Sequence, residues 1–177
     1  MVINLSKDHS LISNWVSELR NIAIQTDRMR FRRNLERIAE VIGYEISKGL
    51  AWEEVEVETP LGTHLSKQLK EQPVVATILR AGQPMHNGLL NYFDGADNAF
   101  ISAYRKHHRD GTFEIDLQYV SCPDLTDRVL IICDPMLATG SSLVKTIQYL
   151  PGHRACERLD LETSDGDEKQ DGSYESE

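Results

Sequence analysis

Two short apolar runs constrain the fold of this chain more than any other feature of its sequence. The first is Pro73-Val74-Val75-Ala76-Thr77-Ile78-Leu79, and the second is Arg128-Val129-Leu130-Ile131-Ile132-Cys133. Both are nearly continuous in apolar residues, which is typical of strands covered on both faces of a sheet. Helical spacing of apolar residues follows each run, at about 85–92 and 141–150. This order predicts an α/β domain with a mainly parallel sheet flanked by helices.

The remaining elements are predicted from shorter patterns. Apolar residues recur at helical spacing over 9–25, where Asp8 or Ser10 could cap a helix, and again from about 27 to 48. Residues 53–59 alternate valines with acids and predict a half-exposed strand, followed by a turn at 60–62. A further short strand is predicted over 99–104, and the alternation over 113–119 indicates a hairpin or flap.

The chain changes character after residue 150. The segment 151–177 contains nine acidic and three basic residues, so much of the chain's net charge of -9 lies there. Leu159 and Leu161 are its last aliphatic side chains. Such a composition cannot bury enough surface to offset the entropy of ordering the chain. We therefore predict one domain over 1–150 and a divergent acidic tail over 151–177 that is disordered.

Composition argues against several classes of protein. The body has no general basic excess, so nucleic acid is not expected as the main partner. No apolar run approaches the roughly 20 residues of a membrane span, and the N-terminus does not resemble a signal peptide. The three cysteines are too few and too widely spaced for a disulfide framework or a zinc pattern. A reducing cytoplasm is the expected location.

The second apolar run ends in an acid, a small-residue loop and a helix start. Strand ends in open α/β sheets are where ligands bind, and a helix N-terminus offers free N–H groups to a phosphate. The Thr139, Ser141 and Ser142 hydroxyls could add hydrogen bonds, Gly140 permits a close backbone approach, and Asp134 could accept from sugar hydroxyls. A strand, turn and capped helix with no ligand is the alternative, since caps also favour Ser and Thr.

The stretch Asp134-Pro135-Met136-Leu137-Ala138-Thr139-Gly140-Ser141-Ser142 resembles the motif by which uracil phosphoribosyltransferases bind 5-phosphoribosyl-1-diphosphate (PRPP). The resemblance assigns Thr139, Gly140, Ser141 and Ser142, with Ala138, to the 5-phosphate. It assigns Asp134 to the ribose hydroxyls. Pro135 belongs to the same motif, and Met136 and Leu137 shape the loop or serve only in packing.

Two upstream stretches extend the resemblance. Ile78-Leu79-Arg80-Ala81-Gly82 is similar to the family's diphosphate-contacting loop, with Gly82 leaving room for the ligand. Ser102-Ala103-Tyr104-Arg105 resembles a second diphosphate contact, followed by a mobile flap. Arg80 and Arg105 are therefore assigned to the diphosphate, which suits the planar guanidinium. Taken alone, Arg80 is better explained by a surface ion pair, and the motif after the second apolar run reverses that preference.

The resemblance covers about residues 5–150 and implies transfer of ribose 5-phosphate to uracil, giving UMP and diphosphate in pyrimidine salvage. It also implies Mg²⁺ bound with PRPP, no covalent nucleophile, no directly assigned metal ligand, homo-oligomers of two or more subunits, and GTP activation in some relatives. Nothing after Leu150 resembles the family's C-terminal uracil loop, so the domain is expected to be incomplete and the uracil-binding residues stay unknown. An inactive PRPP-binding or regulatory relative, or a truncated fragment, is the alternative.

Overall fold

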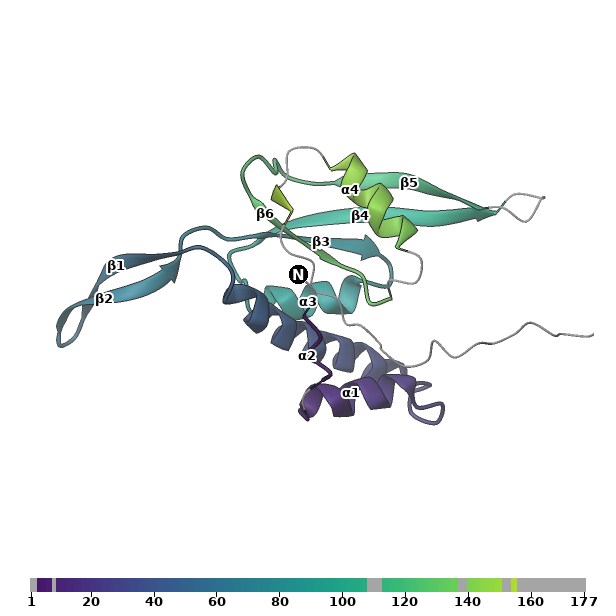
Figure 1. The fold of residues 1–177 in the computed structure, drawn as a ribbon, viewed down its shortest axis with the longest axis horizontal. Coiled ribbons are helices and arrows are strands. Elements are labelled where there is room, and N and C mark those ends of the chain that lie inside the picture. The colour runs from purple at the N-terminus through teal and green to yellow at the C-terminus, as the bar shows by residue number, and fades with distance from the viewer. Residues whose placement is uncertain (1–2, 8, 108–112, 137–139, 151–153, 156–177) are drawn as a thin grey trace, which may run out of the picture.

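The computed structural model describes residues 3–7, 9–107, 113–136, 140–150 and 154–155. A five-stranded sheet forms the middle layer, with α1, α2 and α3 on one side and α4 on the other (Figure 1). The described elements are α1 (Leu11–Arg20), α2 (Arg28–Ser47), β1 (Trp52–Thr59), β2 (Gly62–Leu69), β3 (Val74–Leu79), α3 (Gln83–Leu90), β4 (Asp97–His107), β5 (Phe113–Ser121), β6 (Val129–Cys133), α4 (Ser141–Tyr149) and β7 (Arg154–Ala155).

The two apolar runs form neighbouring parallel strands, as predicted. The strand order is β5-β4-β3-β6-β7, and β3 pairs in parallel with both β4 and β6. Only β5 runs antiparallel, as the second strand of a hairpin with β4. The α/β class and the mainly parallel sheet are therefore confirmed, and both β3 and β6 have two neighbours that run in their own direction.

The helical layer packs closely on the sheet because two helices meet through glycines. A Cβ atom on Gly88 of α3 would lie 2.3 Å from the carbonyl oxygen of Glu36 in α2, and one on Gly43 would lie 3.1 Å from Leu89. The core beneath contains the side chains of Leu35, Ile38, Ala39, Ile42, Val75, Met85, Leu89, Phe93, Ile131 and Cys133. This packing fixes α3, and with it the loop that joins β3 to α3.

Arg128 joins the amino ends of three strands at the edge away from the predicted site. Its guanidinium donates to the carboxylate of Asp97 at the start of β4, and its Nη2 donates to the carbonyl oxygen of Gln72, 3.2 Å away. The side chain is half-buried, so these charge-assisted hydrogen bonds are only partly screened by water. They help to hold β3, β4 and β6 in register.

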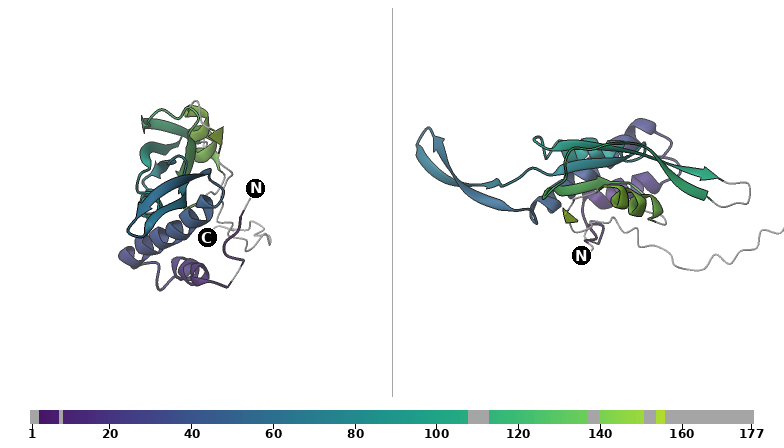
Figure 2. Two further views of the ribbon diagram at one scale, coloured as in Figure 1. Left: turned by 90° about the vertical axis from the view of Figure 1, so that its left-hand side faces the viewer. Right: turned by 90° about the horizontal axis from the view of Figure 1, so that it is seen from above.

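Strands β1 and β2 form a separate antiparallel hairpin that projects from the body (Figures 1 and 2). Sequence analysis predicted β1 and the turn but missed β2, whose residues Gly62–Leu69 lack a strong alternation of apolar and polar side chains. Most of both strands is exposed, as are Leu61 in the turn and Leu65 of β2. The hairpin is therefore held by its own ladder, beginning at the Trp52–Leu69 pair.

Three further boundaries differ from prediction. Helix α1 ends at Arg20, not near residue 25, and Ile22 beyond it is 82% exposed, so no packing extends the helix. Strand β4 continues to His107 because it pairs with β5 beyond the end of β3. Strand β7, which no apolar run predicted, pairs with β6 inside the predicted tail. The rest of the tail, 151–153 and 156–177, lies outside the described residues.

Among the described residues, none of the helices combines the length and the apolar character needed to cross a bilayer.

His86 of α3 is a buried imidazole and predicts a pH-dependent stability. It is 1% exposed, its ring lies 5.2 Å from the Phe100 ring, and neither ring nitrogen has a hydrogen-bond partner of ordinary geometry among the described residues. Burial lowers the pKa of His86 below its usual 6.5, and the backbone of Val75 acts in the opposite direction. The unfolded chain therefore binds a proton more readily than the folded one.

The free energy of unfolding should consequently fall as the pH drops through 6.5, by up to about 1.4 kcal/mol per pH unit for this one group. Urea denaturation of the wild type and of His86→Leu at pH 7.5 and 5.5 checks this. The leucine variant fills the site with an apolar side chain that cannot bind a proton, so it should lose less stability on acidification. Equal losses in the two proteins would show that His86 does not cause the pH dependence.

Candidate active site at the carboxyl edge of the sheet

The predicted site residues follow the carboxyl ends of two neighbouring parallel strands. Thr77 of β3 pairs with Cys133 of β6, so the loops that begin at Arg80 and at Asp134 leave the same edge of the sheet. If β3 and β6 were antiparallel, the loops that follow them would lie at opposite edges of the sheet. The parallel pairing that buries both strands therefore also brings the two candidate loops together.

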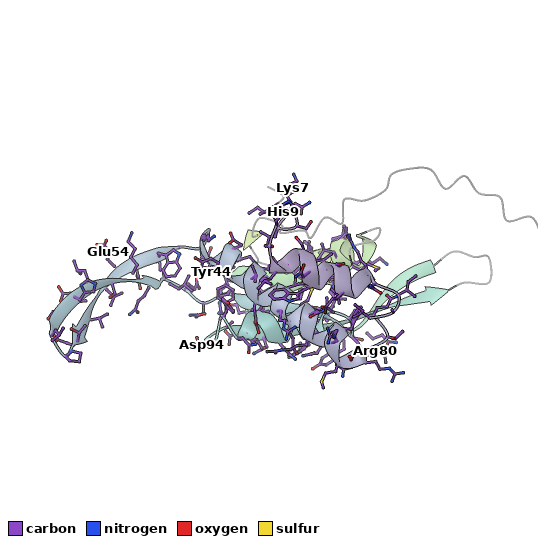
Figure 3. The ribbon with its side chains drawn as sticks, turned by 90° about the horizontal axis from the view of Figure 1, so that it is seen from below. Lys7, His9, Tyr44, Glu54, Arg80 and Asp94 are labelled. Atoms are coloured by element: carbon purple, nitrogen blue, oxygen red, sulfur yellow. The ribbon has the colours of Figure 1, made fainter. Side chains whose placement is uncertain are left out.

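Arg80 occupies the loop between β3 and α3 and is exposed. Figure 3 shows its side chain at the end of the body away from the projecting hairpin, which carries Glu54. Among the described residues, no carboxylate forms an ion pair with Arg80, so the alternative of a surface ion pair gains no support there. The peptide bond between Leu79 and Arg80 is cis. Within the described part of the chain, therefore, no carboxylate competes with an anion from solution for the Arg80 guanidinium.

Gly82 is the N-cap residue of α3 and packs closely against protein atoms. Sequence analysis assigned it to ligand access, but the residue is buried. A Cβ atom on Gly82 would lie 2.5 Å from the carbonyl oxygen of Cys133 and 2.5 Å from Thr77 Oγ1. Real Cβ atoms do not approach oxygen that closely, since dense packing leaves no room for the extra methyl group. The glycine is therefore required by contact with protein atoms.

Asp134 follows β6 directly and is half-buried. Burial raises the pKa of its carboxyl above the usual 3.8, and a hydrogen bond from the Met136 backbone N–H, 3.4 Å from Oδ1, partly offsets this. Among the described residues, no basic side chain pairs with it. A carboxylate kept at a strand end without a compensating cation is a candidate for ligand binding.

The loop after Asp134 is described only in part. Pro135 is half-buried, Met136 is 77% exposed, and the predicted residues Leu137, Ala138 and Thr139 lie outside the described part of the chain. Gly140 precedes the first turn of α4 with φ of 70°, the left-handed region that glycine adopts at little cost. Ser141 and Ser142 form the start of α4, where the backbone N–H groups have no partner within the helix.

Arg105 lies on β4, where it pairs with Ile115 of β5. The pairing of β4 with β3 ends at Ser102 opposite Leu79. Arg105 is therefore three residues, or about 10 Å, further along the strand than the end of β3. The structure places its backbone beyond the same carboxyl edge, on the hairpin that borders the candidate site.

Two polar residues beneath the Arg80 loop were not singled out by sequence analysis. Thr77 and His86 are both buried between β3 and α3, and the Thr77 hydroxyl has no hydrogen-bond partner among the described residues. Thr77 stands out only as one hydroxyl in an otherwise apolar strand.

Nearby, burial raises the pKa of the Cys133 thiol to about 12, with a further contribution from the Asp134 charge, so this thiol is not a nucleophile at neutral pH.

Fold and site together define an α/β protein with its candidate site at the carboxyl edge of a parallel sheet. Comparison with known proteins narrows this class. The sequence model described as uracil phosphoribosyltransferase matches residues 6–159. The chain belongs to the uracil phosphoribosyltransferase family.

Individual relatives agree with this membership. The chain is 54% identical over 142 residues to the uracil phosphoribosyltransferase of Porphyromonas gingivalis, a match covering 80% of this chain and 66% of that protein. It is 37% identical over 154 residues to the uracil phosphoribosyltransferase of Haloarcula marismortui, a match covering 82% of this chain and 68% of that protein. A solved structure of a protein from Aquifex aeolicus has a TM-score of 0.73 and 30% identity, covering 85% of this chain and 69% of its own. The match to the first relative thus spans just under two thirds of that protein.

Proposed function

We propose that this chain binds PRPP and acts as a uracil phosphoribosyltransferase, forming UMP and diphosphate from uracil and PRPP. The observation that carries the proposal is the placement of Arg80 and Asp134 after neighbouring parallel strands, on one edge of the sheet. A cationic loop and an anionic loop side by side suit a ligand in which a diphosphate lies next to sugar hydroxyls.

Each loop has its own part in this proposal. Arg80 and Arg105 bind the diphosphate, and Asp134 accepts hydrogen bonds from the ribose hydroxyls. The start of α4, with Ala138, Thr139, Gly140, Ser141 and Ser142, binds the 5-phosphate. During the reaction the bond from the ribose C1 to diphosphate breaks, a bond from C1 to uracil N1 forms, and the N1 proton is released to water or to the diphosphate. Positive charge develops on the sugar, and the arginines stabilise the negative charge that collects on the leaving group.

Mg²⁺ enters this proposal with PRPP. Among the described residues, no group of three or more His, Cys, Asp and Glu side chains could hold a metal ion. The half-buried Asp134 carboxylate offers one oxygen donor group, which fits an ion whose remaining ligands are diphosphate oxygens and water. When bound, Mg²⁺ would neutralise charge on the diphosphate, and no covalent nucleophile is required.

Three further features belong to the proposal. The exposed apolar side chains of the hairpin, Trp52, Leu61 and Leu65, support a homo-oligomer of two or more subunits, because a two-stranded hairpin alone is marginally stable in water. Sedimentation equilibrium measures that state. The free thiols of Cys122 and Cys133 agree with a cytoplasmic location. GTP is included as a proposed activator.

The test is a UMP-formation assay with radiolabelled uracil, PRPP and Mg²⁺, run with and without GTP. The proposal predicts UMP that depends on both substrates. Uracil-independent loss of PRPP, or no UMP from protein with a cooperative unfolding transition, would contradict the transferase activity. Saturable PRPP binding without UMP would instead favour an inactive PRPP-binding relative.

A further inference from the structure

Gly82 connects the two candidate loops physically. It lies in the Arg80 loop, and the oxygen that a Cβ atom there would meet at 2.5 Å belongs to the peptide bond between Cys133 and Asp134. The other close atom, Thr77 Oγ1, belongs to β3, the strand that leads into the Arg80 loop and pairs with β6. Thr77 and Cys133 are themselves cross-strand partners. The backbone of the Arg80 loop therefore packs directly against the Cys133 carbonyl, where the Asp134 loop begins, and leaves no room for a methyl group.

The surroundings leave little freedom for this contact to relax. Thr77 is 0% exposed and Cys133 2% exposed, and both lie in ladders that fix their backbones. Gly82 is also held by its own hydrogen bonds, because its N–H donates to the Ile78 carbonyl and its carbonyl accepts from the His86 N–H, both at 3.0 Å. A larger residue at 82 cannot turn away and must move one loop relative to the other.

We infer that Gly82 is a positioning residue that sets the spacing between the diphosphate loop and the ribose-binding Asp134. This inference rests on the proposed function, since it assigns a role within the proposed PRPP site. Gly82 itself contacts no ligand in this scheme. Its lack of a side chain lets Arg80 and Asp134 approach closely enough to hold the diphosphate and the ribose of one molecule. A displacement of about 1 Å at such a site is enough to weaken binding strongly.

The decisive variant is Gly82→Ala, with inorganic diphosphate plus Mg²⁺ and ribose 5-phosphate as separate probes in isothermal titration calorimetry. We expect PRPP and both probes to bind at least about tenfold more weakly per folded molecule, because one methyl group displaces both loops. The fitted stoichiometry reports the folded fraction, so a loss of folded protein is not mistaken for a loss of affinity.

Two other glycines provide matched controls. A Cβ atom on Gly88 would lie 2.3 Å from a backbone oxygen in α2, so Gly88→Ala should lower the melting temperature and leave the affinity of the folded fraction unchanged. At Gly49 the nearest atom would be 3.6 Å away, so Gly49→Ala should change neither quantity.

The double variant Gly82→Ala/Thr77→Ala removes one of the two obstructing oxygens and should fold even if the single variant does not. Its affinities should stay low, because the Cys133 carbonyl still meets the new methyl group. Recovery of wild-type affinity in the double variant would overturn the inference, since Thr77 alone would then be the obstacle. Loss of diphosphate affinity with unchanged ribose 5-phosphate affinity would also overturn it. Wild-type protein that binds no PRPP and neither probe would reject the proposed function itself.

Discussion

Arg80→Ala is expected to weaken PRPP binding about 100-fold while leaving the fold intact. The guanidinium is exposed, and no described carboxylate pairs with it, so its removal should change the free energy of unfolding by less than about 0.5 kcal/mol. In the complex it would make charge-assisted hydrogen bonds to the diphosphate, each worth roughly 1.5–3 kcal/mol. Arg80→Lys keeps the charge but loses the planar fork, so about a tenfold loss is expected.

Calorimetry with PRPP and Mg²⁺ measures the affinities of the wild type, Arg80→Ala and Arg80→Lys, and urea denaturation measures their stability. Arg32→Ala is a suitable control, because Arg32 is an exposed arginine on α2, outside the candidate site. It should bind PRPP as the wild type does. An Arg80→Ala protein with wild-type affinity would remove Arg80 from the site, and the diphosphate would then need another cationic partner.

Asp134→Asn is expected to make the fold more stable while it weakens PRPP binding. Replacing a half-buried carboxylate that has no described cationic partner should raise the free energy of unfolding at neutral pH by on the order of 1 kcal/mol, as is common where a residue is retained for function. The same change should weaken PRPP binding about 10- to 100-fold, because the amide is a poorer acceptor for ribose hydroxyls than a carboxylate.

The pH dependence of this stabilisation follows from the direction of the pKa shift. The folded pKa of Asp134 lies above the unfolded value of 3.8. The charged form therefore destabilises the fold at neutral pH, and this penalty disappears as the pH falls through the folded pKa toward 3.8. Urea denaturation should show a stability gap between variant and wild type that shrinks on acidification.

Asp94→Asn is the control for this prediction. Asp94 is an exposed acid in the loop before β4, at the other edge of the sheet, and should show neither effect (Figure 3). An Asp134→Asn protein that is less stable than wild type would mean that the hydrogen bond from the Met136 N–H to the carboxylate outweighs the cost of burying its charge.

The sequence was most informative where burial and local pattern agree. Strands β3 and β6 are apolar along their length because both faces are covered, so their positions and their parallel pairing were predictable. Helix α2 has an apolar stripe and an Asp27 cap whose carboxylate accepts from the Met29 and Arg30 N–H groups. The placement of Arg80 and Asp134 on one edge follows from this topology alone.

Prediction failed where tertiary contacts decide the outcome. Strand β2 is mostly exposed and exists because it pairs with β1, which no local pattern of its own indicates. Ile22 continues the helical spacing of α1, yet its side chain is 82% exposed and the helix stops before it. The close packing of Gly82 involves a carbonyl oxygen 51 residues away in sequence, so it could not be predicted from the glycine alone.

The central claim is that the loops after β3 and β6 form one PRPP site, and direct calorimetric titration of PRPP with Mg²⁺ into the wild-type chain tests it. The account predicts saturable binding with one site per chain, and competition by inorganic diphosphate and by ribose 5-phosphate. A protein that unfolds cooperatively but gives no binding heat at several temperatures, and no ligand-dependent rise in melting temperature, would contradict it.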